Sequence, residues 1–320
     1  MRPVVSIIMP VFNRLKYLRA AIDSVFMQSL PDWELLIADD GSGPDTRDYL
    51  RTLDGRPRVE VLRLSRTGNP GAVRNAALRE ASGEYVAFLD SDDVWMPGKL
   101  QTQIASLRSH ASRQWSYTGF TLVDGSGGPL AGTQVKRSPA HDGWILDQLV
   151  REEALVVTPS VVVRREFIEE IGGYNETLLA CEDYELWVRL ASRSEVDFID
   201  EPLVLVRRHG EHTFDDVTCL ENMRRAVELI QRSGAASHLD AVLRKRRANV
   251  SAKLARAHAL SGRPIRVAAT LLSSARHSWR YREWWLGAFA ATARAFAPPA
   301  ALRAVRKYRR GGRAGLEPRT

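Results

Sequence analysis

The sequence predicts an α/β fold, in which a mostly parallel sheet is flanked by helices and followed by a basic helical extension. Three observations predict it. Short, almost continuously apolar segments alternate with helical segments over residues 1–100. Clusters of polar residues follow these apolar segments, at the end of a strand where open α/β sheets bind ligands. Beyond residue 221 the chain becomes rich in Ala and Arg and is helical in pattern.

Four segments of aliphatic and β-branched residues predict strands that are buried on both faces of a parallel sheet. They are residues 4–9, 33–38, 59–64 and 85–89. Three segments with apolar residues at helical spacing connect them. They are residues 15–28, 46–53 and 72–81. Strict alternation of strand and helix is typical of a parallel sheet wrapped by helices.

Beyond residue 100 the alternation is less regular. We expect helices at residues 100–109, 165–171 and 183–192. We expect strands at residues 115–123, 160–163 and 198–206, the last of them broken by Pro202. We find no internal repeat.

The composition is that of an ordinary soluble globular protein. The 320 residues are 44% hydrophobic and 26% charged. The two cysteines, Cys181 and Cys219, have no metal-ligand spacing and give no disulfide framework, so we expect a reducing, cytoplasmic location. The first apolar run is short and ends at Pro10, which predicts a first strand rather than a signal peptide.

The net charge of +8 is distributed unevenly along the chain. Residues 1–220 hold 24 Lys and Arg against 33 Asp and Glu, a net charge of −9. Residues 221–320 hold 22 against 5, a net charge of +17. An acidic body with a basic C-terminal region predicts two functions or two neighbours.

Three carboxylates in four residues, Asp90, Asp92 and Asp93, follow the fourth predicted strand. Like charges this close repel and raise one another's pKa unless a cation shares the site. A divalent hard cation prefers oxygen ligands and commonly bridges protein carboxylates to substrate phosphates. A single helix cap would use only one of the three acids, so we favour a metal and phosphate site here over an acidic loop.

Polar residues also follow the first two strands. Pro10, Val11, Phe12 and Asn13 end the first, where a plain turn before a helix is the simpler interpretation. The segment 39–42 ends the second with two aspartates, and Asp-Gly is also a common turn sequence. On the same edge of the sheet as Asp90, however, a carboxylate accepts from a base N–H or a ribose hydroxyl.

Three further motifs have an ordinary structural interpretation when taken singly. Arg74 is either an exposed helical arginine or a ligand for a diphosphate and ribose. Glu182 and Asp183 begin a helix, where the macrodipole favours acids, yet a carboxylate there also suits a general base. His209 follows the last strand and becomes a ligand only if that strand brings it beside the acidic site.

Taken in order, these motifs resemble glycosyltransferase family 2. The ordered set comprises PVFN at 10–13, DDGS at 39–42, Arg74-Asn75, GEY at 83–85, LDSDD at 89–93, WMP at 95–97, GGYNE at 172–176, Glu182-Asp183 and Arg207-Arg208-His209. The resemblance covers about residues 3–213 and is best over residues 1–100. It implies the GT-A fold and metal-dependent, inverting transfer of a sugar from a nucleotide-diphosphate donor.

The resemblance also implies roles for individual residues. The nucleotide-binding set is Pro10, Val11, Phe12, Asn13, Asp39, Asp40, Arg74, Asp90 and Ser91, with Asp40 reading the base, usually uracil or a thymine relative. Asp92 and Asp93 would hold Mg²⁺ or Mn²⁺ on the diphosphate, and His209 would approach the diphosphate or the metal. Asp183, next to Glu182, would be the catalytic base that deprotonates the acceptor hydroxyl.

We therefore divide the chain into a catalytic domain at 1–220 and a basic helical region at 221–320. Residues 1–100 would bind the nucleotide, and residues 101–220 the acceptor, which we expect to be a glycan or a lipid-linked sugar. The Gln-x-x-Arg-Trp pattern of the family's processive synthases is absent from the sequence, which favours a single addition over polymer synthesis.

Two other functions are weaker alternatives. A sugar-nucleotide pyrophosphorylase would have a Gly-rich phosphate loop directly after the first strand, where this chain has residues 10–14 without a glycine. A non-catalytic nucleotide-sugar-binding relative is disfavoured because both Asp92 and Asp183 are present.

The basic C-terminal region combines cationic runs at 244–247 and 303–313 with aromatic residues, and Trp285, Phe289 and Phe296 share one helical face. Arg294 and Pro298-Pro299 argue against a membrane span. A basic helix with Trp and Phe on one face suits an anionic membrane surface, which would make the protein peripheral at the inner face of the membrane. A helical appendage packed on the acidic body is the equal alternative; nucleic-acid binding is not expected.

Overall fold

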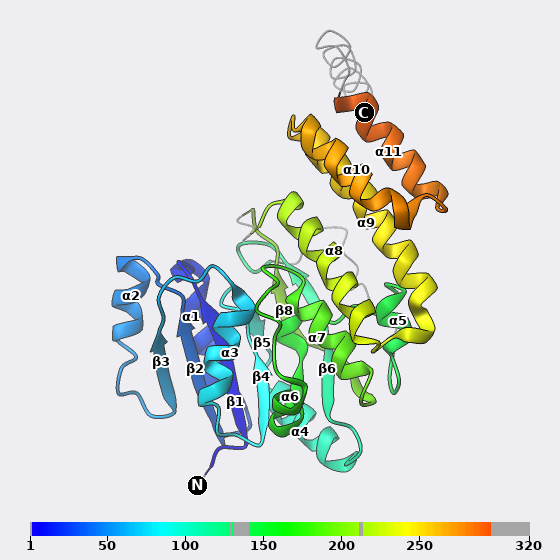
Figure 1. The fold of residues 1–320 in the computed structure, drawn as a ribbon. Coiled ribbons are helices and arrows are strands. Elements are labelled where there is room, and N and C mark those ends of the chain that lie inside the picture. Colours follow the sequence, from blue (N-terminus) through cyan, green and yellow to red (C-terminus); the bar gives the residue numbers. More distant parts are fainter. Residues whose placement is uncertain (1, 129, 131–140, 211–213, 296–320) are drawn as a thin grey trace, which may run out of the picture. The chain divides into compact units, whose positions relative to one another are not determined.

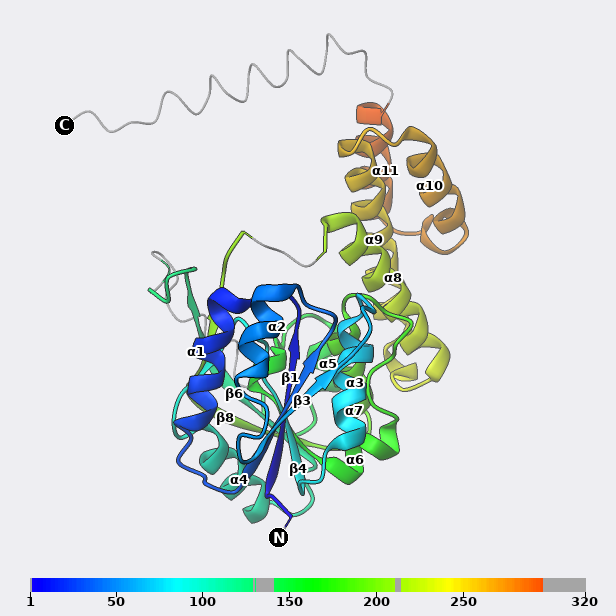
Figure 2. The same cartoon turned by 90° about the vertical axis from the view of Figure 1, so that its left-hand side faces the viewer.

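The computed structural model describes residues 2–128, 130, 141–210 and 214–295, and Figures 1 and 2 show the ribbon from two directions. The chain divides into two compact units. The first contains residues 1–214 and 228–240, and the second residues 215–227 and 241–320. Phe296, Pro298-Pro299 and the cationic run 303–313 lie outside the described residues.

The first unit is built around one eight-stranded sheet of order β3-β2-β1-β4-β7-β6-β8-β5. Its strands are β1 (Val5–Val11), β2 (Trp33–Asp39), β3 (Val59–Arg63), β4 (Tyr85–Phe88), β5 (Val94–Trp95), β6 (Trp115–Val123), β7 (Val162–Arg164) and β8 (Val196–Arg207). Strands β3, β2, β1 and β4 are parallel, as are β6 and β8, whereas β7 and β5 run antiparallel to their neighbours. The predicted α/β fold with a mostly parallel sheet is confirmed.

The register of the central strands determines where the site lies. Strand β1 lies between β2 and β4 and pairs in parallel with both, with Val11 opposite Asp39 and Ile8 opposite Phe88. All three strands are almost wholly buried, as their apolar sequences predict. Since parallel strands end at the same edge, the polar segments that follow β1, β2 and β4 lie next to one another.

Two strands of the first unit differ from the prediction. Strand β8 continues through Pro202 instead of breaking there, because the pairing with β6 shifts register around Gly119, which lies opposite Pro202. A Cβ at Gly119 would lie 3.0 Å from the Glu201 carbonyl, so glycine permits this close approach. Strand β5 was not expected, since only the two residues Val94 and Trp95 form it.

Helices cover both faces of the sheet. The helices of the first unit are α1 (Leu15–Phe26), α2 (Pro44–Arg51), α3 (Pro70–Glu80), α4 (Lys99–Ser109), α5 (Leu146–Val150), α6 (Arg165–Ile171) and α7 (Glu182–Ala191). Figure 2 shows α1, α2 and α4 on one side of the sheet and α3, α6 and α7 on the other. A large apolar core lies around the central strands and includes Ile7, Leu18, Leu35 and Ile104.

The second unit is helical, as predicted for this region. Its helices are α9 (Asp240–Leu260), α10 (Pro264–Ser278), α11 (Arg282–Ala295) and the first part of α8 (Asp216–Ser233), which contributes to both units. Small residues of α9 pack against α10 and α11, with Ala252 against Trp284 and Ala255 against Val267. Within the described ranges, none of the helices has the length and apolar character that a membrane span requires.

Candidate active site

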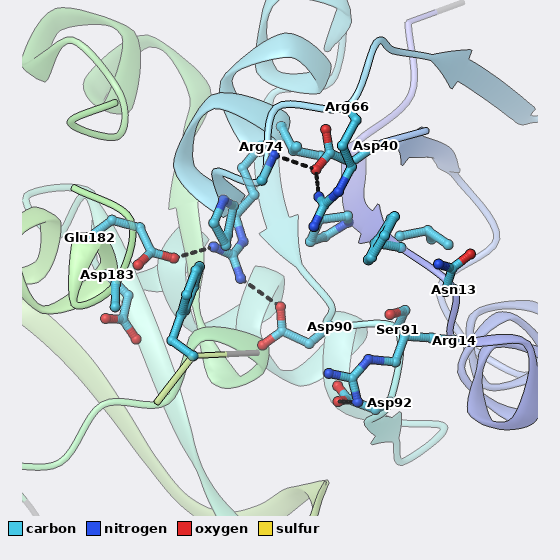
Figure 3. Close-up of a pocket in the computed structure, with 18 of the residues that line it drawn as sticks. Asn13, Arg14, Asp40, Arg66, Arg74, Asp90, Ser91, Asp92, Glu182 and Asp183 are labelled. Carbon is cyan, nitrogen blue, oxygen red and sulfur yellow. Dashed lines mark hydrogen bonds and ion pairs between the residues drawn. The ribbon is translucent and has the colours of Figure 1, made fainter. Parts of the chain in front are cut away.

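A cavity of about 560 Å³ opens at the carboxyl edge of the parallel strands, and Figure 3 shows it in close-up. The residues that line it come from the ends of β1, β2, β3 and β4, the starts of α3 and α7, and the segment before α8. They are Pro10, Val11, Phe12, Asn13, Arg14, Asp40, Arg66, Gly68, Pro70, Val73, Arg74, Asp90, Ser91, Asp92, Ala180, Cys181, Glu182, Asp183 and Phe214. Segments that are far apart in the sequence therefore form one pocket.

Most of the site residues predicted from the sequence lie in this cavity. The eleven that line it are Pro10, Val11, Phe12, Asn13, Asp40, Arg74, Asp90, Ser91, Asp92, Glu182 and Asp183. Three others, Asp39, Asp93 and His209, are not among the lining residues. The structure gives the positions of all fourteen, while the roles assigned to them from the sequence stay predictions.

Asp40 is held by the loop that follows β3. Its buried carboxylate accepts hydrogen bonds from the Thr67 amide at 2.6 Å, the Thr67 hydroxyl at 2.9 Å and the Gly68 amide at 2.9 Å, and it is ion-paired with Arg66. The Arg66 guanidinium also lies over the Phe12 ring, 3.5 Å from its centroid. Phe12, Arg66 and Asp40 thus form one side of the cavity, built from three different strand ends.

The loops after β1 and β2 are tied to each other. The Asn13 side chain accepts from the Gly43 amide at 2.6 Å, and the Asn13 amide donates to the Ser42 hydroxyl at 3.0 Å. Asn13 has φ of 52°, a left-handed conformation that asparagine tolerates better than most residues. Asp39 is buried and accepts from the Ser42 amide at 3.0 Å, so its carboxylate supports the turn.

Arg74 connects the two halves of the cavity, as Figure 3 shows. One guanidinium nitrogen lies 2.7 Å from an oxygen of Asp90, and another lies 2.7 Å from an oxygen of Glu182. Arg74 is buried, so these two carboxylates supply the negative charge that its buried guanidinium requires. Burial raises the pKa of Asp90. The positive charge of Arg74 opposes this shift, and the negative charge of Asp92 adds to it.

The two predicted catalytic acids begin helix α7. Burial raises the pKa of Glu182 to about 7, with Arg74 opposing the shift and Asp183 adding to it. Asp183 is less buried; its oxygens accept from the Thr158 hydroxyl at 3.2 Å and from the Tyr184 amide at 2.7 Å. Thr158 belongs to a short turn, Thr158–Ser160, whose Pro159 carbonyl accepts from the indole of Trp95 at 2.8 Å.

Contacts between α3 and the loop before α7 place these acids in the cavity. The Asn75 side chain donates to the Tyr174 carbonyl at 2.9 Å and accepts from the Tyr174 amide at 2.9 Å. Gly71, at the start of α3, has no side chain that would crowd Glu182. The Arg74-Asn75 pair and the GGYNE segment, which are separate motifs in the sequence, are therefore in direct contact.

A second charged group lies near Asp92. One Asp92 oxygen is 2.9 Å from Nε2 of His209 and 3.3 Å from a guanidinium nitrogen of Arg14, and Arg14 is 3.0 Å from the same His209 nitrogen. The His209 ring stacks on Tyr17, with ring centroids 4.9 Å apart. His209, which follows β8, thus lies beside the acidic site. This is the condition that the sequence analysis set for a ligand role of His209.

Asp93 faces away from this group. Its carboxylate accepts from the Arg207 amide at 2.8 Å, and burial raises its pKa well above the ordinary value, with Asp90 and Asp92 adding to the shift. Asp93 therefore connects the acidic segment to β8. Within the described ranges, no group of three His, Cys, Asp or Glu side chains has the arrangement of a metal site.

Two arginines of the cavity were not in the predicted set. Arg14 directly follows the PVFN motif, and only the structure places it beside Asp92 and His209. Arg66 follows the third strand. Examining the end of the third strand as closely as the other strand ends would have identified it, since all parallel strands end at the same edge.

Comparisons with known proteins agree with this geometry. Residues 6–114 match the family model described as Glycosyl transferase family 2. TuaG of Bacillus subtilis (strain 168), named for teichuronic acid biosynthesis, is 40% identical over 130 residues, which are 40% of this chain and 51% of TuaG. WfgD of Escherichia coli, named as a UDP-Glc:alpha-D-GlcNAc-diphosphoundecaprenol beta-1,3-glucosyltransferase, is 41% identical over 122 residues, 38% of this chain and 47% of WfgD.

The match thus spans about half the length of these two relatives. Among solved structures, residues 1–349 of S. aureus TarS in complex with UDP-GlcNAc superimpose with a TM-score of 0.67 and 22% identity. This similarity covers 87% of the present chain and 81% of that chain and supports the fold alone. The family match, the two relatives and the fold thus identify a glycosyltransferase family 2 domain over residues 6–114, in a chain with the GT-A fold.

Proposed function

We propose that the protein transfers a sugar from a UDP- or dTDP-sugar to a hydroxyl of a glycan or lipid-linked acceptor, with inversion at the anomeric carbon. The observation that carries the proposal is one cavity with two separate carboxylate groups. Asp90 and Asp92 lie on one side, and Asp183 lies beside Glu182 on the other, with Arg74 between Glu182 and Asp90 (Figure 3). Inverting transfer uses one group for the leaving diphosphate and another for the nucleophile.

Asp183 is the proposed general base. Each of its oxygens accepts one protein hydrogen bond, from Thr158 and from the Tyr184 amide, which fixes the orientation of the carboxylate. A carboxylate oxygen has a further lone pair with which it can accept the proton of an acceptor hydroxyl. Glu182 faces Arg74 instead, so it is the weaker candidate for proton removal.

The diphosphate would lie near Asp92, Arg14 and His209. Arg14 is a suitable partner for phosphate oxygens. Asp92 and His209 offer one oxygen and one nitrogen 2.9 Å apart, and this pair fits a divalent cation that takes its remaining ligands from the diphosphate and water. Such an ion, when bound, neutralises charge that develops on the leaving diphosphate. Asp93, which bonds the backbone of β8, is less suited to this role.

The donor and acceptor classes rest on the relatives. The name of WfgD gives UDP-Glc as donor and a GlcNAc-diphosphoundecaprenol acceptor, and the TarS structure contains UDP-GlcNAc. Uracil and thymine share the N3–H that an acceptor such as Asp40 could read, although Asp40 is already bonded to the 66–68 loop. The glycosyltransferase family 2 match over residues 6–114 argues against the pyrophosphorylase alternative.

The test is a screen of UDP-, dTDP- and GDP-sugars for donor hydrolysis and for transfer to a GlcNAc-diphospho-lipid, with Mg²⁺, Mn²⁺ or EDTA. We expect activity with a UDP- or dTDP-sugar, loss of activity in EDTA, and a strong reduction in Asp92→Ala. Asp183→Asn should lower kcat by about 10²–10⁴-fold while the Kd for UDP stays close to that of the wild type.

The matched control is Asp45→Asn, which changes an exposed acid in the first turn of α2, away from the cavity. It should leave kcat unchanged. Full transfer activity in Asp183→Asn would place the base elsewhere, and activity that survives both EDTA and Asp92→Ala would reject the metal. A product with the anomeric configuration of the donor would reject inversion.

A further inference from the structure

Helices α10 and α11 of the second unit expose large apolar side chains. Ile265 and Leu272 lie on α10, and Trp279 directly follows its last residue. The three are spaced seven residues apart and therefore lie on one stripe of the helix. Leu272 is 77% exposed. Single exposed apolar residues are ordinary, but a stripe of three is not explained by packing within the unit.

Helix α11 has a similar stripe. Trp285, Leu286 and Phe289 are exposed and lie within four residues of one another, which places them on neighbouring positions of one helical face. Phe289 is 77% exposed and Trp285 57%. The shared face predicted for Trp285 and Phe289 is present, while Phe296 lies outside the described residues.

The packing of the unit explains why these residues remain outside. Helices α10 and α11 turn other residues toward α9, namely Val267, Leu271, Ala275, Trp284, Ala288 and Ala291. The exposed stripes therefore lie on the sides of α10 and α11 that do not contact α9. The two helices contact each other, and the Trp285 indole donates to the Trp279 carbonyl at 2.8 Å, which links the two stripes.

The charge around the stripes is strongly positive. Residues 263–295 contain six arginines, at positions 263, 266, 276, 280, 282 and 294, against one acid, Glu283. The Arg280 guanidinium lies over the Trp279 ring, 5.0 Å from its centroid, so charge and aromatic surface meet at the turn between the helices. Glu283 is itself 3.5 Å from Lys245 of α9.

We propose that the face formed by α10 and α11, defined by Ile265, Leu272, Trp279, Trp285, Leu286 and Phe289, binds an anionic phospholipid surface. Tryptophan prefers the boundary between water and hydrocarbon, where its ring is buried and its N–H finds a partner. Arginines beside the apolar side chains pair with lipid phosphates. Neither helix has the length and apolar character for a span, so both lie in the interface.

Two other partners fit this face less well. A second copy of the chain would cover the apolar stripes but would bring the same arginines together, and like charges across an interface oppose association. A nucleic acid would match the arginines but would offer no apolar surface for the aliphatic side chains of Ile265, Leu272 and Leu286. The combination of aliphatic, indole and guanidinium groups favours lipid.

The test uses the full chain and sedimentation with vesicles, either phosphatidylcholine alone or an equal mixture with phosphatidylglycerol. We expect binding to the anionic vesicles, a blue shift of tryptophan fluorescence, and much weaker binding to neutral vesicles or at about 500 mM salt. Trp285→Ser with Phe289→Ser should lower the vesicle partition coefficient by about tenfold or more. Arg276→Gln with Arg280→Gln should weaken binding to anionic vesicles only.

The matched control for the apolar change is Trp144→Ser. Trp144 lies in the first unit, and its exposed fraction of 59% is similar to the 57% of Trp285. Circular dichroism would check that each variant folds. Wild-type binding by the Trp285 and Phe289 double variant, or equal binding to neutral vesicles, would overturn the proposal. The proposal would also be overturned if the chain bound no vesicles and instead formed a dimer or bound an oligonucleotide through these same residues. Donor hydrolysis is measured separately, so failure here leaves the proposed function untouched.

Discussion

Arg74 shows how one buried side chain constrains the catalytic unit at the scale of residues. It lies between Asp90, at the end of β4, and Glu182, at the start of α7. A buried charge is tolerated only when partners with good geometry surround it, and two carboxylates need a cation with two separated donors. The planar guanidinium of arginine provides this fork, which the single ammonium of lysine does not.

Replacing Arg74 by methionine should therefore be costly. Arg74→Met leaves two buried carboxyl groups without their cation, and we expect a loss of about 3–5 kcal/mol in the free energy of unfolding. Urea denaturation at neutral pH would measure it. Arg79→Met on the same helix is the control. Arg79 is exposed, and its ion pair with Glu176 is long at 4.0 Å, so this substitution should cost about 0.5 kcal/mol or less. Equal losses in the two variants would contradict the bridging role.

The pKa of Glu182 predicts a pH dependence of stability. Burial raises this pKa from 4.5 to about 7, so the folded protein holds the proton over a range in which the unfolded chain releases it. The stabilising contribution is complete below pH 4.5 and is lost as the pH rises to about 7. The loss relative to Glu182→Gln, which stays neutral, should reach about 3 kcal/mol.

Urea denaturation of both proteins between pH 4 and 8 would measure this difference. The stability of Glu182→Gln should change less than that of the wild type over this range, and the two curves should become parallel near pH 8, about one unit above the pKa of Glu182. Curves that run parallel throughout would show that Glu182 is ionised with an ordinary pKa.

At the scale of elements, the start of α7 depends on the double glycine that ends α6. Gly172 and Gly173 have φ of 90° and 66°, so both adopt the left-handed region that favours glycine. They differ in surroundings: a Cβ on Gly172 would meet nothing within 4 Å, whereas one on Gly173 would lie 2.7 Å from the Asn75 side-chain oxygen. Asn75 is the residue that holds Tyr174, so the clash would reach the segment leading to Asp183.

These two glycines make a matched pair for mutagenesis. Gly172→Ala should cost about 1–2 kcal/mol from backbone conformation alone. Gly173→Ala should cost about 1–3 kcal/mol more, because Asn75 must move, and it should also lower donor turnover. Urea denaturation and a hydrolysis assay would measure both effects. The same loss in both variants would show that Asn75 accommodates the new methyl group.

The loops of the cavity illustrate the same dependence on distant elements. Residues 66–68 after β3 bind Asp40 after β2, and Asn13 after β1 binds the 42–43 turn. Each hydrogen bond joins the ends of two different strands. The loops on one face of the cavity are therefore bonded to one another because neighbouring parallel strands end together, and the turn sequences alone do not contain this information.

At the scale of the whole molecule, the chain has two kinds of core. The first unit buries long aliphatic and aromatic residues around the central sheet. The second brings helices close together with small residues, and a Cβ on Gly287 of α11 would lie 2.5 Å from the Ala252 side chain on α9. Separate cores predict that the two units unfold in separate transitions.

Gly287→Val should therefore act on one unit only. The added side chain cannot fit against Ala252, so calorimetry should show one transition lowered by about 5 °C or more and the other unchanged. Ala290→Val introduces the same residue at an exposed position of α11 and should have little effect on either transition. A parallel shift of both transitions in Gly287→Val would show that the two units unfold as one.

Much of the fold could be predicted from local pattern. Strands β1 to β4 and their helices were found because long apolar runs and regular alternation signal them strongly. Strand β5 could not be found, since two residues carry no periodicity and form a strand only because β8 lies beside them. The continuity of β8 through Pro202 likewise depends on a register shift around a glycine of another strand.

For the site, the sequence by itself determined which residues lie at strand ends and which acids begin α7, because apolar runs fix where buried strands stop. Only the tertiary structure decided which of these side chains meet. Asp92 faces Arg14 and His209, whereas Asp93, one residue later, bonds the backbone of β8. The reason is that residues 90–93 form a turn, closed by the Asp93 amide and the Asp90 carbonyl, and the pairing of β5 with β8 brings Arg207 beside Asp93. The bridge from Asp90 through Arg74 to Glu182 is decided in the same way, by packing of α3 against α7.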